Sequence, residues 1–361
     1  MRIEFDDGTL LLRDAPENVP HAEWDDRVDE HRTQAYRYRA LLEWAGTWTG
    51  SDDQATLRDG FGRSCEDAAR AYPDLELTPA LHIEPRDYQQ AALDAWIDHD
   101  RRGSVVLPTG SGKTFLGLQA IADAGVSALV MAPTIDLMNQ WHATLTNAFG
   151  DQLTESVGVL GGGSHDVTAI TVTTYDSAYR YVNEYGDQFG LLVVDEEHHL
   201  PAPTYRQIPE MMIAPYRLGL TATYERPDGK HELLEDLLGP VVYREDVDEL
   251  AGEYLSEYET IHMSVELTAD EREQYDEEYQ IYRDYVDSHE FDLWKEEGYA
   301  EFLKRTSYDP QGRRALIAKQ RAERIARTAE KKLDTLDNLI KRHHDDRAII
   351  FTANNDFAYD I

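Results

Sequence analysis

A short apolar run that enters a glycine-rich turn constrains the fold of this chain more than any other stretch. Residues 105–107 (Val-Val-Leu) are typical of a buried strand, and apolar residues at helical spacing begin with Phe115. Gly110 and Gly112 lie between them and allow the backbone to turn its N–H groups toward one point, where the start of the helix adds a partial positive charge. The stretch therefore predicts an anion site between a strand and a helix.

The residue types in this turn indicate which anion binds. The frame G-x-x-x-x-G-K-[ST] fits at Gly112, Lys113 and Thr114, whereas Leu107 or Pro108 stands where the first glycine often lies. A lysine at this position reaches the β- and γ-phosphates of a nucleotide, and the threonine hydroxyl holds Mg²⁺. The alternative is a chance glycine turn before a helix. The predicted nucleotide-binding residues of the loop are Thr109, Gly110, Ser111, Gly112, Lys113 and Thr114.

Apolar runs recur after the loop, and each is followed by polar residues. The runs are Ala128–Met131, Ala169–Val172, Leu191–Val194 and Tyr216–Leu220. Short, almost wholly hydrophobic strands are expected where both faces of a parallel sheet are covered. The polar residues that follow should collect at the carboxyl edge of such a sheet, where ligands bind. The pattern predicts an α/β fold with a nucleotide site at that edge.

Two acids follow the run at Leu191–Val194. Asp195 lies where phosphate-loop ATPases place the acid that binds Mg²⁺, and Glu196 can orient and deprotonate an attacking water. An acidic strand-to-helix turn is the alternative. His198 and His199 raise a zinc site as a further possibility, but no cysteine or additional histidine lies at ligand spacing. We therefore expect them to form hydrogen bonds beside the γ-phosphate.

A segment upstream of the loop offers an amide to the base of a nucleotide. Arg86-Asp87-Tyr88-Gln89 heads a helix that ends before Arg101. The amide of Gln89 presents one donor and one acceptor, which suits the edge of adenine. A solvated helix start is an equally good interpretation of these residues alone.

Negative charge is spread along the whole chain. The 361 residues include 70 acidic and 35 basic ones, for a formal charge of −35, which usually argues against a nucleic-acid partner. Because 41% of the residues are hydrophobic, we interpret the charge as the salt adaptation of a folded, halophilic protein and not as disorder.

Other features of the composition concern compartment and size. The length predicts two or three domains. Cys65 is the lone cysteine, no apolar run approaches the ~20 residues of a membrane helix, and the start of the chain has no signal-peptide features. These observations predict a cytoplasmic protein with no membrane partner. A monomer is expected.

Residues 1 to about 75 predict a small accessory domain. Asp7-Gly8 between the apolar residues of 3–5 and 10–12 is a hairpin signal, and a helix with Leu41 and Leu42 follows. The aromatic residues of this region form either a small core, which we favour, or a base-stacking platform. They are Trp24, Tyr36, Tyr38, Trp44 and Trp48.

Residues 265–335 predict helices with divided charge. Residues 266–301 contain 14 acids and 3 bases, whereas residues 304–347 contain 13 bases and 7 acids. One helix face carries Arg314, Arg321, Arg324 and Lys331. These side chains either meet phosphates or form a solvated face that the acidic helices neutralise, and the second interpretation is slightly favoured. A new strand is expected at Ala348–Thr352.

Six segments in this order resemble the motifs of the superfamily 2 helicases, and the likeness runs essentially from end to end. The segments are Arg86–Gln89, Leu107–Thr114, Ala132–Leu137, Thr173–Ala178, Asp195–His199 and Leu218–Thr223. Val19–Ala22 and Tyr36–Arg39 are similar to the N-terminal damage-recognition domain of the archaeal XPB branch.

The resemblance implies an ATP-dependent motor that moves along or opens duplex DNA in repair or promoter opening. It implies ATP and Mg²⁺ as cofactors, DNA as a partner, and a nuclease or a repair or transcription protein as a further partner. The implied fold is a RecA-like parallel sheet with a small N-terminal α+β domain and a C-terminal helical arm. The implied domains are a damage-recognition-like domain at 1–78, a first RecA-like ATPase lobe at 79–247, a helical thumb-like region with a linker helix at 248–343, and the first strand of an incomplete second lobe at 344–361.

The resemblance also implies a role for each matching residue. Catalysis falls to Glu196, Lys113 and Asp195, with Thr114 and Asp195 on Mg²⁺, and Gln89 and Arg86 join the loop in nucleotide binding. DNA contact and coupling fall to Thr134, Thr174, His199, Thr221, Thr223, Arg226 and Asp228. For the threonines, capping of strand ends by their hydroxyl groups is the alternative.

One departure from the family pattern affects the expected activity. After Thr223 the family often has Arg-Glu-Asp in a loop linked to strand separation, whereas this chain has Arg226-Pro227-Asp228. Pro227 removes a carboxylate and an N–H and fixes φ, which favours translocation over unwinding. Three alternatives remain: a nucleotide- or DNA-binding fragment with little turnover, the motor subunit of a restriction-type enzyme, and an RNA helicase.

Overall fold

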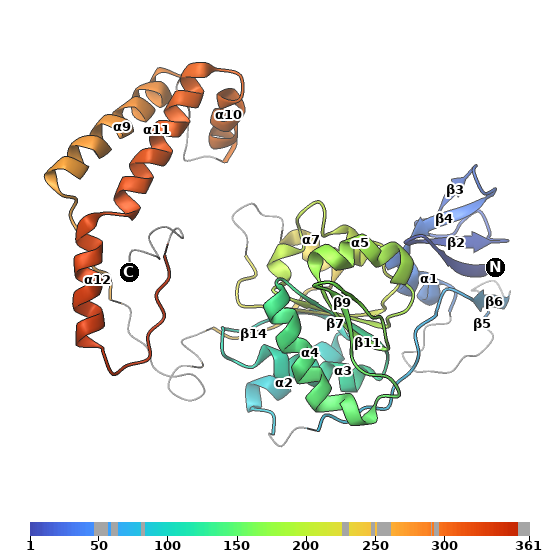
Figure 1. Ribbon diagram of the computed structural model, residues 1–361. Helices are drawn as coiled ribbons and strands as arrows, with labels where there is room; N and C mark the ends of the chain where they lie inside the picture. Colours follow the sequence, from blue (N-terminus) through green and yellow to red (C-terminus); the bar gives the residue numbers. More distant parts are fainter. Residues whose placement is uncertain are drawn as a thin grey trace. The chain divides into compact units, whose positions relative to one another are not determined.

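The chain divides into two units. The computed structural model describes residues 1–46, 57–58, 64–80, 84–225, 231–246, 250, 261–289, 291 and 296–352. One unit, Met1–Tyr258, contains a small N-terminal sheet and a large parallel sheet, and the regular elements described in the other, Glu259–Ile361, are helices (Figure 1). Trp48, Arg226, Pro227 and Asp228 lie outside the described residues.

The N-terminal sheet has six strands in the order β3-β4-β2-β1-β6-β5. Asp7 and Gly8 connect β1 and β2 with φ of 49° and 79°, the pair of left-handed residues that a two-residue hairpin turn requires. The predicted hairpin is therefore confirmed. The strands are β1 (Arg2–Asp6), β2 (Thr9–Arg13), β3 (Glu23–Asp25), β4 (Glu30–Gln34), β5 (Leu57–Arg58) and β6 (Ser64–Asp67).

A short helix packs against this sheet. The 3₁₀ turn η1 (Ala35–Arg37) leads into α1 (Tyr38–Trp44), whose Tyr38 and Leu41 are buried in one core with Ile3 of β1. The predicted aromatic core is confirmed only in part. Tyr38 is 1% exposed, whereas Trp24 is 51% exposed and lies edge-on to His31.

Eight strands form the large sheet, in the order β10-β9-β11-β8-β12-β13-β7-β14. Neighbouring strands pair in parallel, except for β10 with β9. The four apolar runs predicted after the glycine turn contribute β8, β11, β12 and β13 to this sheet, so the predicted α/β fold is confirmed. The strands are β7 (Arg102–Val106), β8 (Ala128–Ala132), β9 (Gly158–Gly161), β10 (Ser164–His165), β11 (Ile170–Thr174), β12 (Leu191–Asp195), β13 (Tyr216–Thr221) and β14 (Val241–Arg244).

Two layers of helices cover the large sheet (Figure 1). In β8, Ala128 and Val130 belong to one core, whereas Leu129 and Met131 belong to the other. Because successive side chains of a strand point to opposite faces, one apolar run supplies both cores. The first layer contains α2 (Asp87–Asp98), α3 (Lys113–Ala124) and α4 (Ile135–Phe149), and the second contains α5 (Tyr175–Tyr185), α6 (Gln207–Glu210) and α7 (Glu232–Leu237).

Polar contacts join the N-terminal sheet and α1 to the region of the large sheet. Arg39 of α1 donates from Nη1 to the carbonyl oxygen of Asp100 at 2.9 Å. Asn183 of α5 donates from Nδ2 to Oδ1 of Asp7 at 2.7 Å. Asp100 and Arg101 have φ of 56° and 60°, so Arg39 contacts a strained turn directly before the strand that enters the glycine loop.

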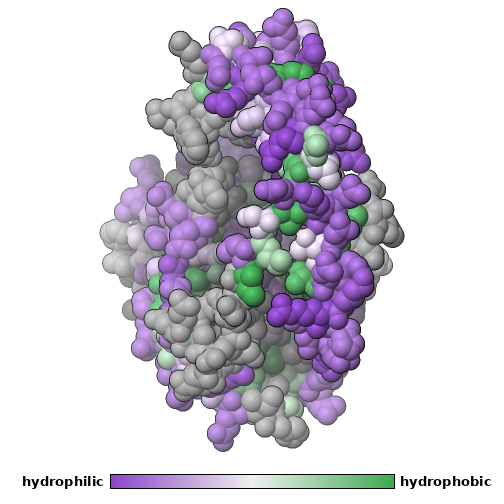
Figure 2. Space-filling view, turned by 90° about the vertical axis from the view of Figure 1, so that its left-hand side faces the viewer, coloured by the Kyte–Doolittle hydropathy of each residue, from purple (hydrophilic) through white to green (hydrophobic). Residues whose placement is uncertain are grey.

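The described residues of the second unit form four helices, and the prediction of helices over 265–335 is confirmed. They are α9 (Ala269–Ser288), α10 (Glu296–Thr306), α11 (Pro310–Arg327) and α12 (Glu330–Arg342). Tyr282, Tyr285, Phe302 and Ala315 form a small core among them. Arg321 of α11 pairs with Glu278 of α9 at 3.1 Å, so the acidic helix neutralises part of the basic face. The face in Figure 2 is mostly hydrophilic over its described residues.

The strand expected at Ala348–Thr352 is not formed. Ile349 and Phe351 are 82% and 91% exposed, and no described strand pairs with this segment. An apolar run becomes a strand only where a neighbour accepts its backbone hydrogen bonds. Among the described helices, none combines the length and the apolar character needed to cross a membrane.

Candidate nucleotide-binding site

The glycine turn lies between β7 and α3, as predicted. Gly110 and Gly112 have φ of 84° and 86°, a conformation that favours glycine. A Cβ atom at Gly112 would lie 2.5 Å from Nε2 of Gln89. Helix α3 begins at Lys113 with Gly112 as its N-cap, so the first N–H groups of the helix have no acceptors within it. Glycine thus occupies the positions where the turn requires it.

The polar groups of the turn fit the phosphates of a nucleotide. Lys113 donates from Nζ to the carbonyl oxygen of Leu107 at 3.2 Å. Burial lowers the pKa of Lys113, and the charges of Glu196 and Asp195 oppose that shift, so both acids lie within electrostatic range of the ammonium. The buried hydroxyl of Ser111 has no hydrogen-bond partner in the described part of the chain. A cation, an unpaired hydroxyl and free helix N–H groups suit an anionic ligand.

Asp195 ends β12 and is 8% exposed. Its Oδ2 accepts a hydrogen bond from Nε1 of Trp141 at 2.9 Å. Burial raises the pKa of Asp195, while the bond from Trp141 opposes the shift. Trp141 therefore supports the charged form of the acid. The sequence predicts Trp141 only as an apolar residue of a helix. No sequence pattern predicts its hydrogen bond from α4 to Asp195 at the end of β12.

Glu196 follows in a left-handed conformation with φ 53° and ψ 53°, which is uncommon for a residue with a side chain. Its Oε2 lies 3.5 Å from Oγ1 of Thr221 and 3.4 Å from Nδ1 of His198. Nδ1 of His198 lies 3.1 Å from the same threonine hydroxyl, which donates to the carbonyl of Thr223 at 2.9 Å. The structure thus joins the second acid to the end of β13.

The two histidines after Glu196 occupy different positions. His198 lies between Glu196 and Thr221, whereas the coupling role expected of His199 stays a prediction. The ring of His199 lies 6.2 Å from that of Tyr175. The described residues contain no group of three or more His, Cys, Asp or Glu side chains able to hold a metal ion. Asp195 offers a carboxylate, which is the kind of ligand that Mg²⁺ takes in proteins while it keeps several waters and phosphate oxygens.

The start of α2 is tied to the loop. Gln89 donates from Nε2 to the carbonyl of Ser111 at 2.8 Å and accepts from the backbone N–H of Arg86 at 3.0 Å. Tyr88 donates to the same carbonyl of Ser111 at 2.5 Å, and Arg86 donates to the hydroxyl of Tyr88 at 3.0 Å. The predicted base-binding residues therefore contact the predicted phosphate-binding residues directly.

Two of the predicted threonines cap helices at the carboxyl edge of the sheet. The hydroxyl of Thr134 accepts from the N–H of Leu137 at the start of α4. The hydroxyl of Thr174 accepts from the N–H of Ser177 at the start of α5. The hydroxyl groups thus cap the starts of two helices, whereas the alternative in the sequence analysis was capping of strand ends. Helix capping does not exclude a ligand, because other N–H groups of each first turn remain without acceptors in the helix.

Glu197 is a buried acid that sequence analysis does not single out. It is 0% exposed, and its Oε2 accepts from Oγ of Ser104 at 2.7 Å. Its Oε1 has no partner among the described residues, and burial raises its pKa to about 8. A Cβ atom at Gly219 would lie 1.7 Å from Oε2. Gly219 therefore provides the space that this carboxyl group occupies against β13.

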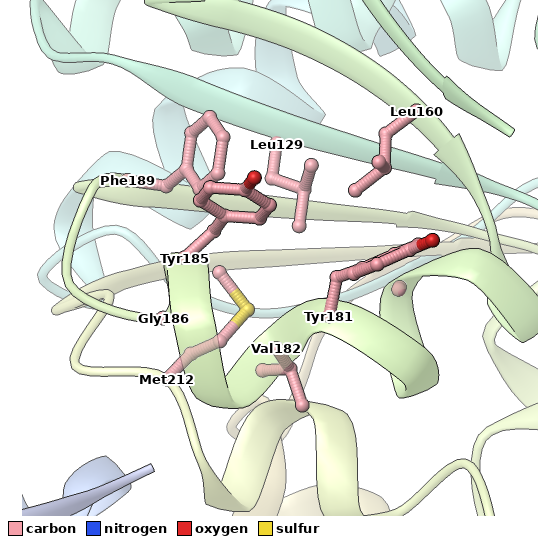
Figure 3. A pocket seen from close by; sticks show the side chains of 9 residues that line it. Leu129, Leu160, Tyr181, Val182, Tyr185, Gly186, Phe189 and Met212 are labelled. Carbon is pink, nitrogen blue, oxygen red and sulfur yellow. The ribbon is translucent and has the colours of Figure 1, made fainter. Parts of the chain in front are cut away.

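An apolar pocket lies between α5 and the large sheet (Figure 3). Its lining includes Leu129, Leu160, Tyr181, Tyr185, Phe189 and Met212. None of the lining residues is charged, so this pocket does not suit a triphosphate. The glycine turn remains the candidate nucleotide site.

Comparison with known proteins agrees with this geometry. The family model of the type III restriction enzyme res subunit matches residues 82–226, and that of the xeroderma pigmentosum group B helicase damage recognition domain matches residues 3–47. The DNA 3'-5' translocase XPB2 of Sulfurisphaera tokodaii is 39% identical over 354 residues, which are 98% of this chain and 75% of that protein.

Two further relatives match over shorter lengths. The DNA 3'-5' helicase XPB of Mycobacterium tuberculosis is 34% identical and the match covers 60% of this chain and 41% of that protein. A DNA 3'-5' helicase Rad25 of Halobacterium salinarum is 33% identical, with 65% of this chain and 39% of that protein covered. The chain thus spans about two fifths of the length of these two relatives.

The class of protein follows from three features: a parallel sheet with a glycine turn at its carboxyl edge, two acids where β12 ends, with β13 between β12 and β7, and the matching motif order. Together they define a superfamily 2 helicase. Two findings identify the family within that class: the sequence identity to the XPB2 translocase along almost the whole chain, and the match of the N-terminal residues to the damage recognition domain. The chain belongs to the XPB family.

Proposed function

We propose that this chain binds ATP with Mg²⁺ and couples its hydrolysis to movement along duplex DNA or to opening of the duplex. The observation that carries the proposal is that Lys113 lies at the glycine turn, within electrostatic range of Asp195 and Glu196. A cation at the phosphates and two acids at the metal and the water are the parts that phosphoryl transfer needs. The names of the relatives, a DNA translocase and two DNA helicases, support the choice of DNA as the partner.

Each residue of the turn has a distinct task in this proposal. Lys113 and the backbone N–H groups of 110–114 bind the β- and γ-phosphates. Thr114 and Asp195 hold Mg²⁺, which neutralises phosphate charge when bound. Glu196 orients water and accepts its proton. The left-handed turn at Glu196 directs its carboxylate away from the buried side of β12, toward the end of β13.

Gln89 recognises adenine in this proposal, with Arg86 and Thr109 beside it. Each end of its amide already makes one hydrogen bond, to Ser111 and from Arg86. The carbonyl oxygen keeps a second lone pair and the NH₂ group a second hydrogen, so one acceptor and one donor remain for the base. The same side chain therefore links base recognition to the phosphate loop.

DNA contact falls to the helix starts at the carboxyl edge. Thr134 and Thr174 begin α4 and α5, and helix N-termini bind phosphate oxygens. Thr221, Thr223 and His199, with Arg226 and Asp228, carry the coupling of hydrolysis to motion in this proposal. The basic face of α11 adds phosphate contacts. We place the activity in the cytoplasm, in DNA repair or promoter opening, with a nuclease or a repair or transcription protein as partner.

Two substitutions test the ATP site. Lys113→Ala should abolish binding of a fluorescent ATP analogue in the presence of Mg²⁺. Glu196→Gln should retain binding and lose hydrolysis by at least about 100-fold, because a positioned base contributes roughly 10²–10⁴ in rate. Lys341→Ala, which removes an exposed lysine of α12, is the control for lost positive charge. Wild-type binding by Lys113→Ala would refute the assigned site.

Nucleic-acid specificity and turnover need their own measurement. Duplex DNA should raise ATP hydrolysis by the wild-type chain more than duplex RNA of equal length does. Greater stimulation by RNA would favour an RNA helicase. Normal binding of nucleotide and DNA with hydrolysis that DNA does not raise would favour the binding-module alternative.

A further inference from the structure

The hydroxyl of Tyr175 binds the backbone of both acids of the nucleotide site. It donates to the carbonyl oxygen of Asp195 at 2.8 Å and to that of Glu196 at 3.1 Å. Tyr175 is 3% exposed. Burial and the nearby acids raise the pKa of its phenol well above the ordinary value, so the hydroxyl keeps its proton and remains a donor. One side chain of α5 thus contacts the turn that aims Glu196.

The other end of Tyr175 lies at the surface where DNA contact is proposed. It is the first residue of α5 and follows Thr174, whose hydroxyl caps the helix. A phosphate held by the first N–H groups of α5 would contact the backbone of Tyr175 and its neighbours. Few bonds separate that backbone from the phenol, and the phenol is packed between α5 and β12. A shift of the start of α5 therefore moves the hydroxyl.

The turn at Glu196, whose carbonyl group accepts a hydrogen bond from the Tyr175 hydroxyl, has a restricted conformation. Glu196 lies in the small left-handed region, with φ 53°, and its carbonyl also accepts from the N–H of His199 at 3.1 Å. Loss of the bond from Tyr175 leaves that carbonyl with fewer donors and allows the turn to relax. Because the left-handed well is narrow, relaxation changes the direction of the Glu196 side chain by a discrete step.

We infer that Tyr175 is a positioning residue that transmits DNA binding at the start of α5 to the turn carrying Glu196. The inference rests on the proposed function, because it requires DNA at this edge of the sheet. Tyr175 touches neither nucleotide nor DNA through its hydroxyl. It acts by fixing the two carbonyl groups and thereby the direction of the carboxylate.

The test is hydrogen exchange of the backbone N–H groups of His199 and Leu200, which donate to the carbonyls of Glu196 and Glu197. Exchange is measured with and without a short duplex DNA, on the full chain. In the wild type we expect DNA to slow exchange of these two groups by roughly three- to tenfold, the factor that one buried hydrogen bond of ordinary net strength supplies. Tyr175→Phe, which removes only the hydroxyl, should bind DNA and lose this slowing.

Tyr205→Phe is the matched control. Its ring lies 5.2 Å from that of Tyr175, but its hydroxyl donates to Oδ1 of Asp176 and not to the two acids. It should retain the slowing. DNA binding without altered exchange in the wild type, or slowing that persists in Tyr175→Phe, would overturn the inference while leaving the proposed function intact. A wild-type chain that fails to bind duplex DNA would overturn the proposed function, and the inference with it. Even if Tyr175→Phe folds poorly, the inference remains falsifiable, because DNA binding without slowed exchange in the wild type overturns it.

Discussion

Trp141 sets the electrostatics of Asp195 through a single hydrogen bond. Its indole N–H is the donor that lowers the pKa of a carboxyl group which burial raises. Without that donor the pKa of Asp195 rises further, and less of the carboxylate form is available to Mg²⁺. Trp141→Phe should therefore weaken Mg²⁺-dependent binding of an ATP analogue by about tenfold, as removal of a partner behind a metal ligand commonly does. The loss should grow as the pH falls, because a higher pKa leaves more of the carboxyl group protonated.

Trp96 offers a control of equal size for this substitution. It is 1% exposed, and its Nε1 donates to the carbonyl of Arg217 at 2.9 Å. Trp96→Phe creates a comparable cavity and removes a comparable bond, but one remote from Asp195. Titration of Mg²⁺ at fixed nucleotide distinguishes the two variants. Equal affinity for Mg²⁺ in both would show that Trp141 acts by packing alone.

Glu197 makes the stability of the protein depend on pH. Its pKa rises from 4.5 to about 8 on folding because the carboxyl group is buried with one hydrogen bond. Above pH 4.5 the unfolded state releases a proton that the folded state still holds. The contribution of Glu197 to the free energy of unfolding is therefore fully present below pH 4.5, and it is lost as the pH rises to about 8. Glu197→Gln removes this dependence while keeping an acceptor for Ser104.

Denaturant unfolding at several pH values measures the effect. Between pH 5 and pH 8 the free energy of unfolding of the wild type should fall relative to that of Glu197→Gln by on the order of 3 kcal/mol. Glu232→Gln, which removes an exposed acid of α7, controls for the change in net charge. A difference between wild type and Glu197→Gln that stays constant with pH would contradict the prediction.

At the scale of elements, Arg217 of β13 joins the ends of two helices of the second layer. It is 0% exposed, and its guanidinium donates to four carbonyl groups. The acceptors are Ala214 and Met212 before the strand, Pro209 in α6, and Leu237 at the end of α7. Arg217→Met should cost roughly 3–5 kcal/mol of unfolding free energy, because four buried carbonyls lose their donor.

Arg206 provides the comparison for this prediction. It forms an exposed ion pair with Glu210 at 2.8 Å, so Arg206→Met should change the unfolding free energy by less than about 0.5 kcal/mol. The loss of unfolding free energy in Arg217→Lys should lie between the losses in the two methionine variants, because one ammonium group cannot reach all the acceptors arranged around the planar guanidinium. Similar unfolding midpoints for Arg217→Met and Arg206→Met would refute the role of the guanidinium as a link between elements.

The elements that sequence predicts well are those whose cause is local. The strands β8 and β12 follow from short apolar runs, and the hairpin at Asp7-Gly8 follows from the conformations that these two residues tolerate. Asp195 and Lys113 were predicted to lie together because the carboxyl ends of parallel strands meet at one edge. Each of these predictions uses residues within one stretch of chain and one rule of topology.

Contacts that depend on strand order were not predictable from the sequence. Tyr175 reaches Asp195 because β8 lies between β11 and β12 and leaves α5 over the ends of both. His198 instead of His199 meets Thr221 because the left-handed Glu196 rotates the turn that follows it. The apolar run at 348–352 was expected to be a strand, but strand formation requires a neighbour that no local pattern supplies.

At the scale of the whole molecule, excess negative charge is the dominant property. A formal charge of −35 creates self-repulsion that opposes folding wherever the charges are not screened. The described surface in Figure 2 is mostly hydrophilic, and basic residues are grouped on α11, where Arg321 pairs with Glu278. Screening by salt should relieve the repulsion and also weaken attraction to DNA phosphates.

High salt should therefore stabilise this protein. Between 0.1 and 2 M KCl the midpoint of thermal unfolding should rise by roughly 10 °C, a shift that corresponds to a few kcal/mol in a chain of this size. Sucrose at matched water activity strengthens apolar burial without screening charge, and should raise the midpoint less. If KCl leaves the midpoint unchanged or lowers it, charge repulsion does not limit stability, and the acidic surface requires an explanation other than salt adaptation.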